Sequence, residues 1–591
     1  MRPGRRRAAS VRLRAGPLAP RTGGVASPLW QAGFVNRLSR ADQLSALRTG
    51  TFDVVVIGGG MTGVGTALDA ASRGLRVALV EKGDLADGTS SKSSKMAHGG
   101  LRYLQQRELR LVYENLHERQ RLLENAPHLV RPLPFLIPLF GRDGVVSKAV
   151  ARSYRTALWL YDMTGGWRIG RRHERLSKDQ VLADFPRLDV DRLVAGFLYW
   201  DARGDDARIA LSIARTAVVA YGAVVATRAQ VTGVGHDAEG RADRVEITPV
   251  AAGDDPRPFE VGARVIVNAT GVWADVLTTL DEGSPSRTLT PAKGVHVTVP
   301  SSRLSTKSAA VLPVAKDRRS VFVMPWEDAG YTYIGTTDTP YDGPLDDPLC
   351  LPEDVDYLLS AVNAATSAEL TPADVTGVWA GLRPLLADDD GHHHSERTAD
   401  LSRRHRVRTA ADGVVHVTGG KWTTYRLMAE HTVDEAARQL PGTSRCKTKS
   451  LRLLGAPTGA APTAVPGVPA ALAARLARRY GTEAAAVVGV AANDPSLLEP
   501  LCDELPYTGA ELVFAARSEL VVTLEDLLSR RTRAHLIDAR ATSRFALRAA
   551  RLVAGELGWD ETRVAAEVGA YRERCERELE AAGVPSGRMG A

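Results

Sequence analysis

A glycine-rich turn between two apolar segments is the feature that most restricts how this chain can fold. Residues 51–81, TFDVVVIGGGMTGVGTALDAASRGLRVALVE, have the pattern of a buried strand, a helix and a second strand. Gly58, Gly60 and Gly63 fit the spacing G-x-G-x-x-G, which combines a tight turn, close approach to a pyrophosphate and close helix–strand packing. Glu81 ends the second strand, where a carboxylate would bind ribose hydroxyls. The unit predicts a Rossmann-like dinucleotide site, and its terminal acid disfavours NADP.

Two later strand ends favour FAD over NAD. The stretch ARVIVNATG runs from a strand into Gly271, and GVVHVTGGKWTTYR runs from a strand through Gly420 into a long helix that begins near Thr423. Glycine at the carboxyl end of a parallel strand allows close backbone approach to a ligand. A helix N-terminus there would favour the negative charge of a reduced flavin. The sequence therefore predicts one nucleotide-binding fold that distant segments complete.

The positive charge of the chain is concentrated at its N-terminus. The net charge is +7, but residues 1–40 contain nine arginines and no acid, so the remainder carries about −2. A near-neutral body argues against nucleic-acid binding. We expect residues 1–45 to form a basic, disordered arm, with a mitochondrial transit peptide as the alternative. A reducing, cytoplasmic compartment without a metal site is indicated by four widely spaced cysteines, Cys350, Cys446, Cys502 and Cys575.

The segments that follow the first unit have different patterns. GVHVTVPSS, SAAVLPVA, RSVFVMPWE and YTYIGTTDTP are short strands without intervening helices, which predicts an antiparallel sheet over one flavin face. The last 140 or so residues have the pattern of short helices, in which Arg530 and Arg531 are expected on a solvated face. The acids of DARGDDAR are expected to cap a helix, and GHHHSE (391–396) is expected to be an exposed loop.

Together these motifs make the chain resemble the FAD-dependent, membrane-associated glycerol-3-phosphate dehydrogenases, within the D-amino-acid-oxidase-like flavoproteins. Besides the glycine fingerprint, the matching stretches are SSKMAHGGLRYL, DARGDDARIAL, NATGVWAD, AKGVH, IGTTDT, AGLRPL, GGKWTTYR and VTLEDLLSRRTRAHL. The resemblance implies an α/β fold, with a Rossmann-like FAD-binding domain, an antiparallel β substrate-binding domain and a helical C-terminal domain. It places the oxidoreductase domain at 46–444 and the helical cap at 445–591. Within the former, the expected FAD-binding segments are 46–145, 190–290 and 405–444, and the expected substrate-binding segments are 146–189 and 291–404.

The resemblance also assigns roles to a loop without acids, residues 88–107. Besides the residues named above, it implies that this loop binds FAD through Thr89, Ser90, Ser94, Gly99 and Gly100. It implies that substrate is bound by Arg102, Tyr103, Arg383 and Arg403, because arginine forks suit phosphate oxygens. The candidate bases are His98 and His296. Lys293 and Lys421 are expected to orient hydroxyls or stabilise the alkoxide, although His296 and Lys293 could instead be a structural strand residue and a surface lysine.

The implied activity is the oxidation of sn-glycerol 3-phosphate to dihydroxyacetone phosphate with FAD, followed by electron transfer to a membrane quinone. The alternatives are an oxygen-using glycerol-3-phosphate oxidase, a related hydroxy or amino acid oxidase, and a non-catalytic or RNA-acting flavoprotein. Residues 147–175 mix aromatic residues with arginines, which predicts either a membrane-surface patch or a core helix with a basic face. We expect a peripheral protein on the inner face of the cell membrane. A homodimer is one possible oligomeric state that the sequence does not decide.

Overall fold

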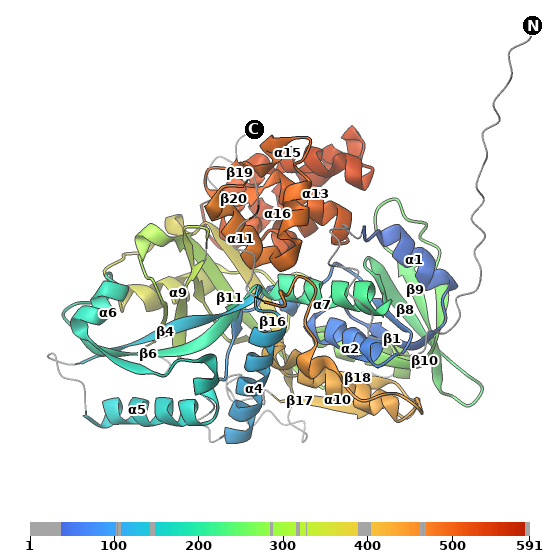
Figure 1. Ribbon diagram of the computed structural model, residues 1–591, viewed down its shortest axis with the longest axis horizontal. Helices are drawn as coiled ribbons and strands as arrows, with labels where there is room; N and C mark the ends of the chain where they lie inside the picture. Colours follow the sequence, from blue (N-terminus) through green and yellow to red (C-terminus); the bar gives the residue numbers. More distant parts are fainter. Residues whose placement is uncertain are drawn as a thin grey trace, which may run out of the picture.

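Two sheets and a C-terminal group of helices make up the part of the chain that the computed structural model describes (Figure 1). The described residues are 37–585 without 102, 104–107, 142–147, 284–287, 315–318, 327, 388–403, 460–464 and 466–467. Within these ranges, no helix is both long and apolar enough to cross a bilayer.

The first sheet forms around the glycine-rich turn. Its strand order is β17 (His405–Thr409), β18 (Val415–Gly419), β10 (Phe259–Asn268), β1 (Phe52–Ile57), β2 (Val77–Val80) and β7 (Val224–Ala226). From β18 to β7 the strands run parallel, and the apolar run of β1 is buried on both faces, as expected for a central parallel strand. The sheet is extended by an antiparallel pair, β8 (Ala229–His236) and β9 (Ala242–Pro249). Its helices are α1 (Arg40–Thr49), α2 (Met61–Ser72), α7 (Asp206–Tyr221), α8 (Ala274–Glu282) and α10 (Tyr425–Ala437).

The second sheet is mostly antiparallel, as the strand pattern predicts. Its order is β15 (Thr339–Pro340), β11 (Leu289–Pro300), β14 (Tyr331–Gly335), β13 (Ser320–Trp326), β12 (Ala309–Pro313), β4 (Val130–Phe140), β6 (Leu193–Gly204) and β3 (Met96–Ala97). Two further strands pair with it, β16 (Gly377–Leu386) with β11 and β5 (Glu174–Ser177) with β6. The helices near it are α4 (Leu109–Asn125), α5 (Lys148–Met163), α6 (Lys178–Asp184) and α9 (Pro352–Asn363).

The C-terminal helices pack on the junction of the two sheets (Figure 1, orange and red). They are α11 (Ala470–Tyr480), α12 (Ala484–Gly489), α13 (Gly509–Ser518), a π-helical turn (Asp526–Arg531), α14 (Ala534–Ile537), α15 (Ala539–Leu557) and α16 (Glu561–Ala581), with the hairpin β19 (Pro500–Cys502) and β20 (Leu505–Thr508). Leu527 and Phe545 share one apolar core with Val295 and Val378 of the second sheet. Burial of this shared core fixes the helical domain against the sheet.

Three expectations about the course of the chain need correction. Residues 37–45 belong to the fold, because Arg40 in α1 forms an ion pair with Asp254 at 2.6 Å. Strands β3, β4 and β6 lie in the second sheet, although they fall in segments expected to bind FAD, because β4 and β6 pair along their length. Arg530 and Arg531 are buried and not solvated, since both bind the buried carboxylate of Asp84. Residues 1–36 and the GHHHSE stretch lie outside the described residues.

Candidate active site

A cavity of about 960 Å³ extends from the N-terminus of α2 to the face of the second sheet formed by β11, β13 and β16. The carboxyl ends of β1, β2, β10 and β18 open into it, which is where parallel sheets bind ligands. One cavity therefore joins the predicted nucleotide site to the predicted substrate site.

The glycine turn has the shape that a pyrophosphate requires. Gly58 has a φ of +110°, a conformation that favours glycine, and its N–H donates to Val80 O. A Cβ on Gly63 would lie 1.9 Å from Gly58 O, so only glycine allows this contact between α2 and the turn. Gly60 caps α2 and faces the cavity, while the Met61 N–H in the first turn of that helix donates to Ser90 Oγ at 2.8 Å. The turn thus presents backbone and a helix N-terminus to the cavity.

Glu81 lies at the end of β2, where the sequence places it. Its two carboxylate oxygens accept hydrogen bonds from Gly59 N at 2.6 Å and Gly83 N at 2.7 Å. Burial raises the pKa of this carboxyl, against the effect of the two N–H donors. The side chain lines the cavity and is held rigidly, as a ribose-binding carboxylate must be.

The distant segments predicted to complete the nucleotide site also reach the cavity. Gly271 and Gly420 have positive φ values, +62° and +77°, at the ends of β10 and β18. Thr423 lies in the turn before α10, and all three residues line the cavity. The residues thus fit an extended dinucleotide, with its pyrophosphate at α2 and its ring system toward β18.

On the opposite wall, Arg383 is held in a fixed position on β16. Its Nη1 donates to Asp338 Oδ1 at 3.1 Å, and its Nη2 donates to Thr336 Oγ1 and Thr337 O, both at 3.0 Å. Gly294, on the neighbouring strand β11, provides the space, because a Cβ there would lie 2.4 Å from Arg383 Nη2. Arg319 also lines this wall and donates to Asp338 O at 2.9 Å. Two guanidinium groups therefore converge around one aspartate.

His296, two residues after Gly294 on β11, lies on the same face of the sheet. Its ring stacks on Trp379 of β16 with centroids 4.8 Å apart, and its Nε2 lies 2.8 Å from Ser94 Oγ. Gly335 on β14 leaves room for the ring, since a Cβ there would lie 2.0 Å from His296 Cδ2. Burial lowers the pKa of His296 well below its usual value, with further lowering from Lys95 and Arg383. The imidazole is therefore neutral at neutral pH.

His98, Tyr103 and Lys421 complete the predicted residues at this end of the cavity. The Lys421 ammonium lies 4.0 Å from the centre of the Tyr103 ring, a cation–π contact between two residues far apart in sequence. A positive charge is thus fixed in the wall that also contains His98.

Several predicted residues have other contacts. Lys293 is separated from His296 by three positions, so the pleat turns it to the opposite face, where it forms a buried ion pair with Asp354 at 2.7 Å. It is neither a cavity residue nor a surface lysine. The N–H of Gly99 donates to Tyr161 and Asp201, and the residue packs against Leu116.

The hydroxyls of the loop line the cavity but already have protein partners. Thr89 Oγ1 donates to Leu382 O, Ser90 Oγ accepts from α2, and Ser94 Oγ bonds to His296. Gly100, also in the wall, has a φ of +81°. Arg102 and Arg403 lie outside the described residues.

Sequence reasoning missed Arg319 and Asp338. Arg319 stands at the start of RSVFVMPWE, whose pattern predicts only a strand, and Asp338 belongs to the motif IGTTDT. No local pattern marks either residue, because their approach to Arg383 depends on how β13, β14 and β16 assemble.

Comparisons with known proteins agree with this geometry. The family model described as "FAD dependent oxidoreductase" matches residues 53–435, and one described as "C-terminal domain of alpha-glycerophosphate oxidase" matches 446–564. Glycerol-3-phosphate dehydrogenase 2 of Mycobacterium tuberculosis is 41% identical over 560 residues, covering 93% of this chain and 92% of its own. Mitochondrial glycerol-3-phosphate dehydrogenase of Homo sapiens is 35% identical over 547 residues, covering 88% of this chain and 73% of its own. The crystal structure of glycerol-3-phosphate dehydrogenase from Bacillus halodurans complexed with FAD aligns with a TM-score of 0.73 and 31% identity, covering 93% of this chain and 98% of its own.

The fold, the cavity and these matches define an FAD-dependent oxidoreductase with a helical C-terminal domain. Within that class, the chain belongs to the FAD-dependent glycerol-3-phosphate dehydrogenase family. The predicted fold class, the predicted cofactor and the resemblance drawn from the sequence motifs are confirmed.

Proposed function

We propose that this protein oxidises sn-glycerol 3-phosphate to dihydroxyacetone phosphate, using bound FAD. The observation that carries the proposal is that Arg383 and the neutral His296 lie on one face of the second sheet, in the same cavity as the nucleotide-binding glycines. The names of the relatives from Mycobacterium tuberculosis and Homo sapiens support this substrate.

Arg383 and Arg319 would bind the substrate phosphate. A dianion removed from water needs fixed cationic donors, and Asp338 holds both guanidinium groups before substrate arrives. Each charge-assisted hydrogen bond contributes about 1.5–3 kcal/mol. Arg102 and Arg403 remain predicted additions to this clamp.

His296 would accept the hydroxyl proton, because its ring is neutral and buried beside the substrate wall. The Ser94 hydroxyl, 2.8 Å from Nε2, would hold the ring in position for this step. His98 is the second candidate base, and Lys421 would stabilise the developing alkoxide. Bound FAD supplies the two-electron acceptor for the hydride that leaves C2.

We further propose that the electrons pass to a membrane quinone. The support is α5 and the turn after it, where Trp159, Leu160, Met163 and Trp167 are exposed among exposed arginines. Figure 1 shows α5 at the lower left edge, away from the C-terminal helices. Exposed aromatic and basic side chains of this kind suit a membrane surface. An oxygen-using oxidase is the second candidate, favoured by the description of the family model that matches the C-terminal domain.

The test is an anaerobic titration of the FAD-loaded protein with sn-glycerol 3-phosphate, followed by flavin absorbance. We expect bleaching by sn-glycerol 3-phosphate and none by glycerol. Arg383→Gln should raise the concentration for half-maximal bleaching about 10- to 100-fold, the equivalent of one lost charge-assisted bond. Arg244→Gln, at a partly exposed arginine on β9, is the matched control and should behave as wild type.

Reoxidation then separates the two acceptors. Recovery of the flavin colour with a quinone in lipid vesicles, and only slow recovery in air, would support the dehydrogenase. Equal affinity in wild type and Arg383→Gln would contradict the phosphate clamp, and no bleaching of a fully loaded protein would contradict the substrate.

A further inference from the structure

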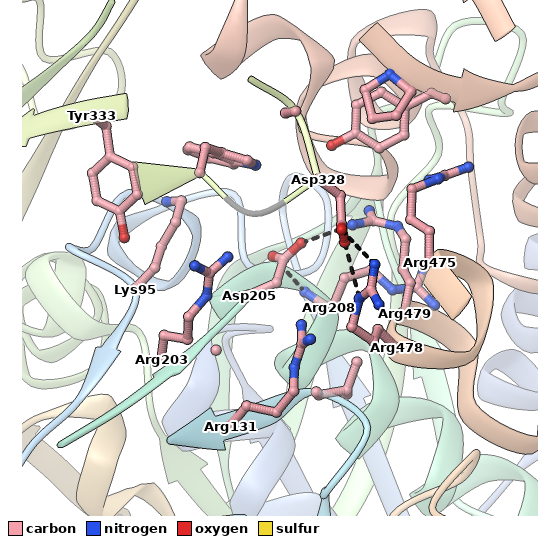
Figure 2. Close-up of a pocket in the computed structure, with 16 residues that line it drawn as sticks. Lys95, Arg131, Arg203, Asp205, Arg208, Asp328, Tyr333, Arg475, Arg478 and Arg479 are labelled. Atoms are coloured by element: carbon pink, nitrogen blue, oxygen red, sulfur yellow. Dashed lines mark hydrogen bonds and ion pairs between the residues drawn. The ribbon is translucent and has the colours of Figure 1, made fainter. Parts of the chain in front are cut away.

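A second, smaller cavity of about 110 Å³ lies between the second sheet and the C-terminal helices (Figure 2). Among the described residues that line it, six are arginines, one is Lys95 and two are aspartates. Figure 2 shows Lys95 and Arg203 on one side and Arg475, Arg478 and Arg479 of α11 on the other. The space is large enough for a tetrahedral oxyanion with its oxygen atoms facing these side chains.

The backbone itself forces like charges together here. Arg131 on β4 and Arg203 on β6 are directly opposite partners in the antiparallel register, so both side chains leave the sheet on the same face. On α11, Arg475, Arg478 and Arg479 have the spacing i, i+3 and i+4, which places them on one helix face. Each arrangement brings several guanidinium groups to one face of its element, and an anion between the sheet and α11 would be attracted to both sets.

The nearby carboxylates are committed to particular cations. Asp328 pairs with Arg478, and Asp205 pairs with Arg479 at 3.2 Å. Behind the wall, Glu511 pairs with Arg475, and both oxygens of Glu519 accept from Arg208 Nη1 at 2.8 Å.

Arg208 adds a donor to the cavity wall. Its side chain is buried, and its Nε has no hydrogen-bond partner among the described residues. An unsatisfied buried donor of a charged group costs free energy that a bound acceptor would recover.

We propose that this cavity is a second anion site, which binds inorganic phosphate or the phosphate group of a small metabolite between β4, β6, α7 and α11. The site is separate from the flavin cavity, and the proposal goes beyond the proposed oxidation. Arginine forks from two domains match a tetrahedral oxyanion, and binding there would hold the C-terminal helices against the sheet.

The cavity is one side-chain layer from His296. The Lys95 ammonium lies 4.6 Å from the Trp379 ring, and that ring stacks on His296. The hydroxyl of Tyr333, also in the cavity wall, donates to the backbone oxygen of Ser94, and the side-chain hydroxyl of Ser94 bonds to His296. Occupation of the cavity is therefore able to influence the candidate active site through contacts that already exist.

The test measures phosphate binding to the FAD-loaded full-length protein by isothermal titration calorimetry, with chloride at equal ionic strength as the blank. The Arg383→Gln background weakens the active-site clamp, so a further loss of binding caused by cavity substitutions reports the second cavity. In that background, we expect Arg131→Gln/Arg203→Gln to weaken phosphate binding at least 10-fold. Arg551→Gln, an exposed arginine in the C-terminal domain, is the charge-matched control and should leave binding unchanged.

A further variant and further ligands distinguish the possible outcomes of this experiment. Arg478→Gln, whose side chain is one-third exposed, should also weaken binding and replaces the double variant if that does not fold. Tighter binding of a three-carbon phosphomonoester than of inorganic phosphate would identify a metabolite as the ligand, and the reverse order would identify free phosphate. Phosphate binding that is unchanged by both cavity variants, or absent once Arg383 is replaced, would overturn the proposal.

Discussion

At the scale of single residues, the nucleotide site depends on two glycines, because the absence of a side chain allows a backbone conformation at one and a close contact at the other. Gly58 has the positive φ that the turn requires, and Gly63 lets the Gly58 oxygen approach the first turn of α2. At Gly262 in β10, by contrast, the nearest atom to a Cβ would be 4.0 Å away. A Cβ is therefore excluded at Gly63 in α2 and accommodated at Gly262 in β10.

We expect Gly63→Ala to lower FAD affinity about 10- to 100-fold. Its Cβ would lie 1.9 Å from Gly58 O, so the turn must open, at a cost of about 1–3 kcal/mol. The measurement is the ratio of flavin to protein absorbance after dialysis, with Gly262→Ala as the control that should retain FAD. Full retention by Gly63→Ala would show that α2 can shift without loss of the site.

At the scale of elements, the end of α8, the end of β8 and the turn between β17 and β18 meet away from the cavity. Asp281 in the last turn of α8 lies 3.3 Å from His236 Nε2 at the end of β8, and that nitrogen lies 3.4 Å from Asp412. Burial and the neighbouring Asp412 charge raise the pKa of Asp281 to about 6. Because this folded-state pKa is above the usual value, the folded protein binds the extra proton.

The free energy of unfolding should therefore fall as pH rises from about 4 to 6, the window between the usual pKa and the raised one. We expect Asp281→Asn to increase the free energy of unfolding at pH 7.5 by about 1 kcal/mol, and to have little effect at pH 4. Urea unfolding at both pH values measures this. Glu282→Gln, at the exposed neighbouring position, is the control. A loss of stability at pH 7.5 would mean that an ion pair with His236 outweighs the repulsion.

Elements were easier to predict than their assembly. The period-2 and apolar patterns gave β1, β2, β11 and the glycine turns, because those patterns are local. The alternation of side chains along a strand could also have excluded Lys293 from the candidate active site, because it is three residues from His296 and so lies on the other face of the sheet. Pairing is not local, so the assignment of β4 and β6 to the second sheet could not be obtained from their own sequences.

Burial of charge was equally hidden in the sequence. Arg530 and Arg531 have the pattern of a polar helix face, and their partner Asp84 stands more than 440 positions earlier. Arg383 was found through a resemblance, whereas Arg319 and Asp338 needed the folded arrangement of three strands.

At the scale of the whole molecule, Asp84 connects the nucleotide site to the C-terminal helices. It follows Glu81 by three residues and accepts from Arg530 Nε at 2.6 Å and from Arg531 Nη1 and Nη2 at 2.6 and 2.8 Å. The two arginines hold the pKa of this buried carboxyl below its usual value, against the effect of burial. Two domains that are distant in sequence thus share one buried group of ion pairs.

Asp84→Asn should destabilise the protein by about 3–5 kcal/mol, because it removes the carboxylate that pairs with the buried guanidinium of Arg531 and one of the carboxylates around Arg530. We expect FAD release and loosening of the C-terminal helices in the same urea transition, measured by flavin fluorescence and by hydrogen exchange of α15 and α16. Asp243→Asn, at an exposed ion pair on β9, should leave the transition unchanged. Two separate transitions in wild type would argue against a shared core.

The order of strands in the first sheet also has a consequence for how the protein is made. Strand β10 lies between β1 and β18, which come from opposite ends of the oxidoreductase domain. A ribosome releases β1 and the glycine turn long before β18 and Thr423 exist, and the partners of Asp84 emerge later still. During synthesis the nascent chain therefore carries an unfinished sheet with an unpaired edge until β18 is made, and any FAD contact that needs Gly420 and Thr423 has to form after that.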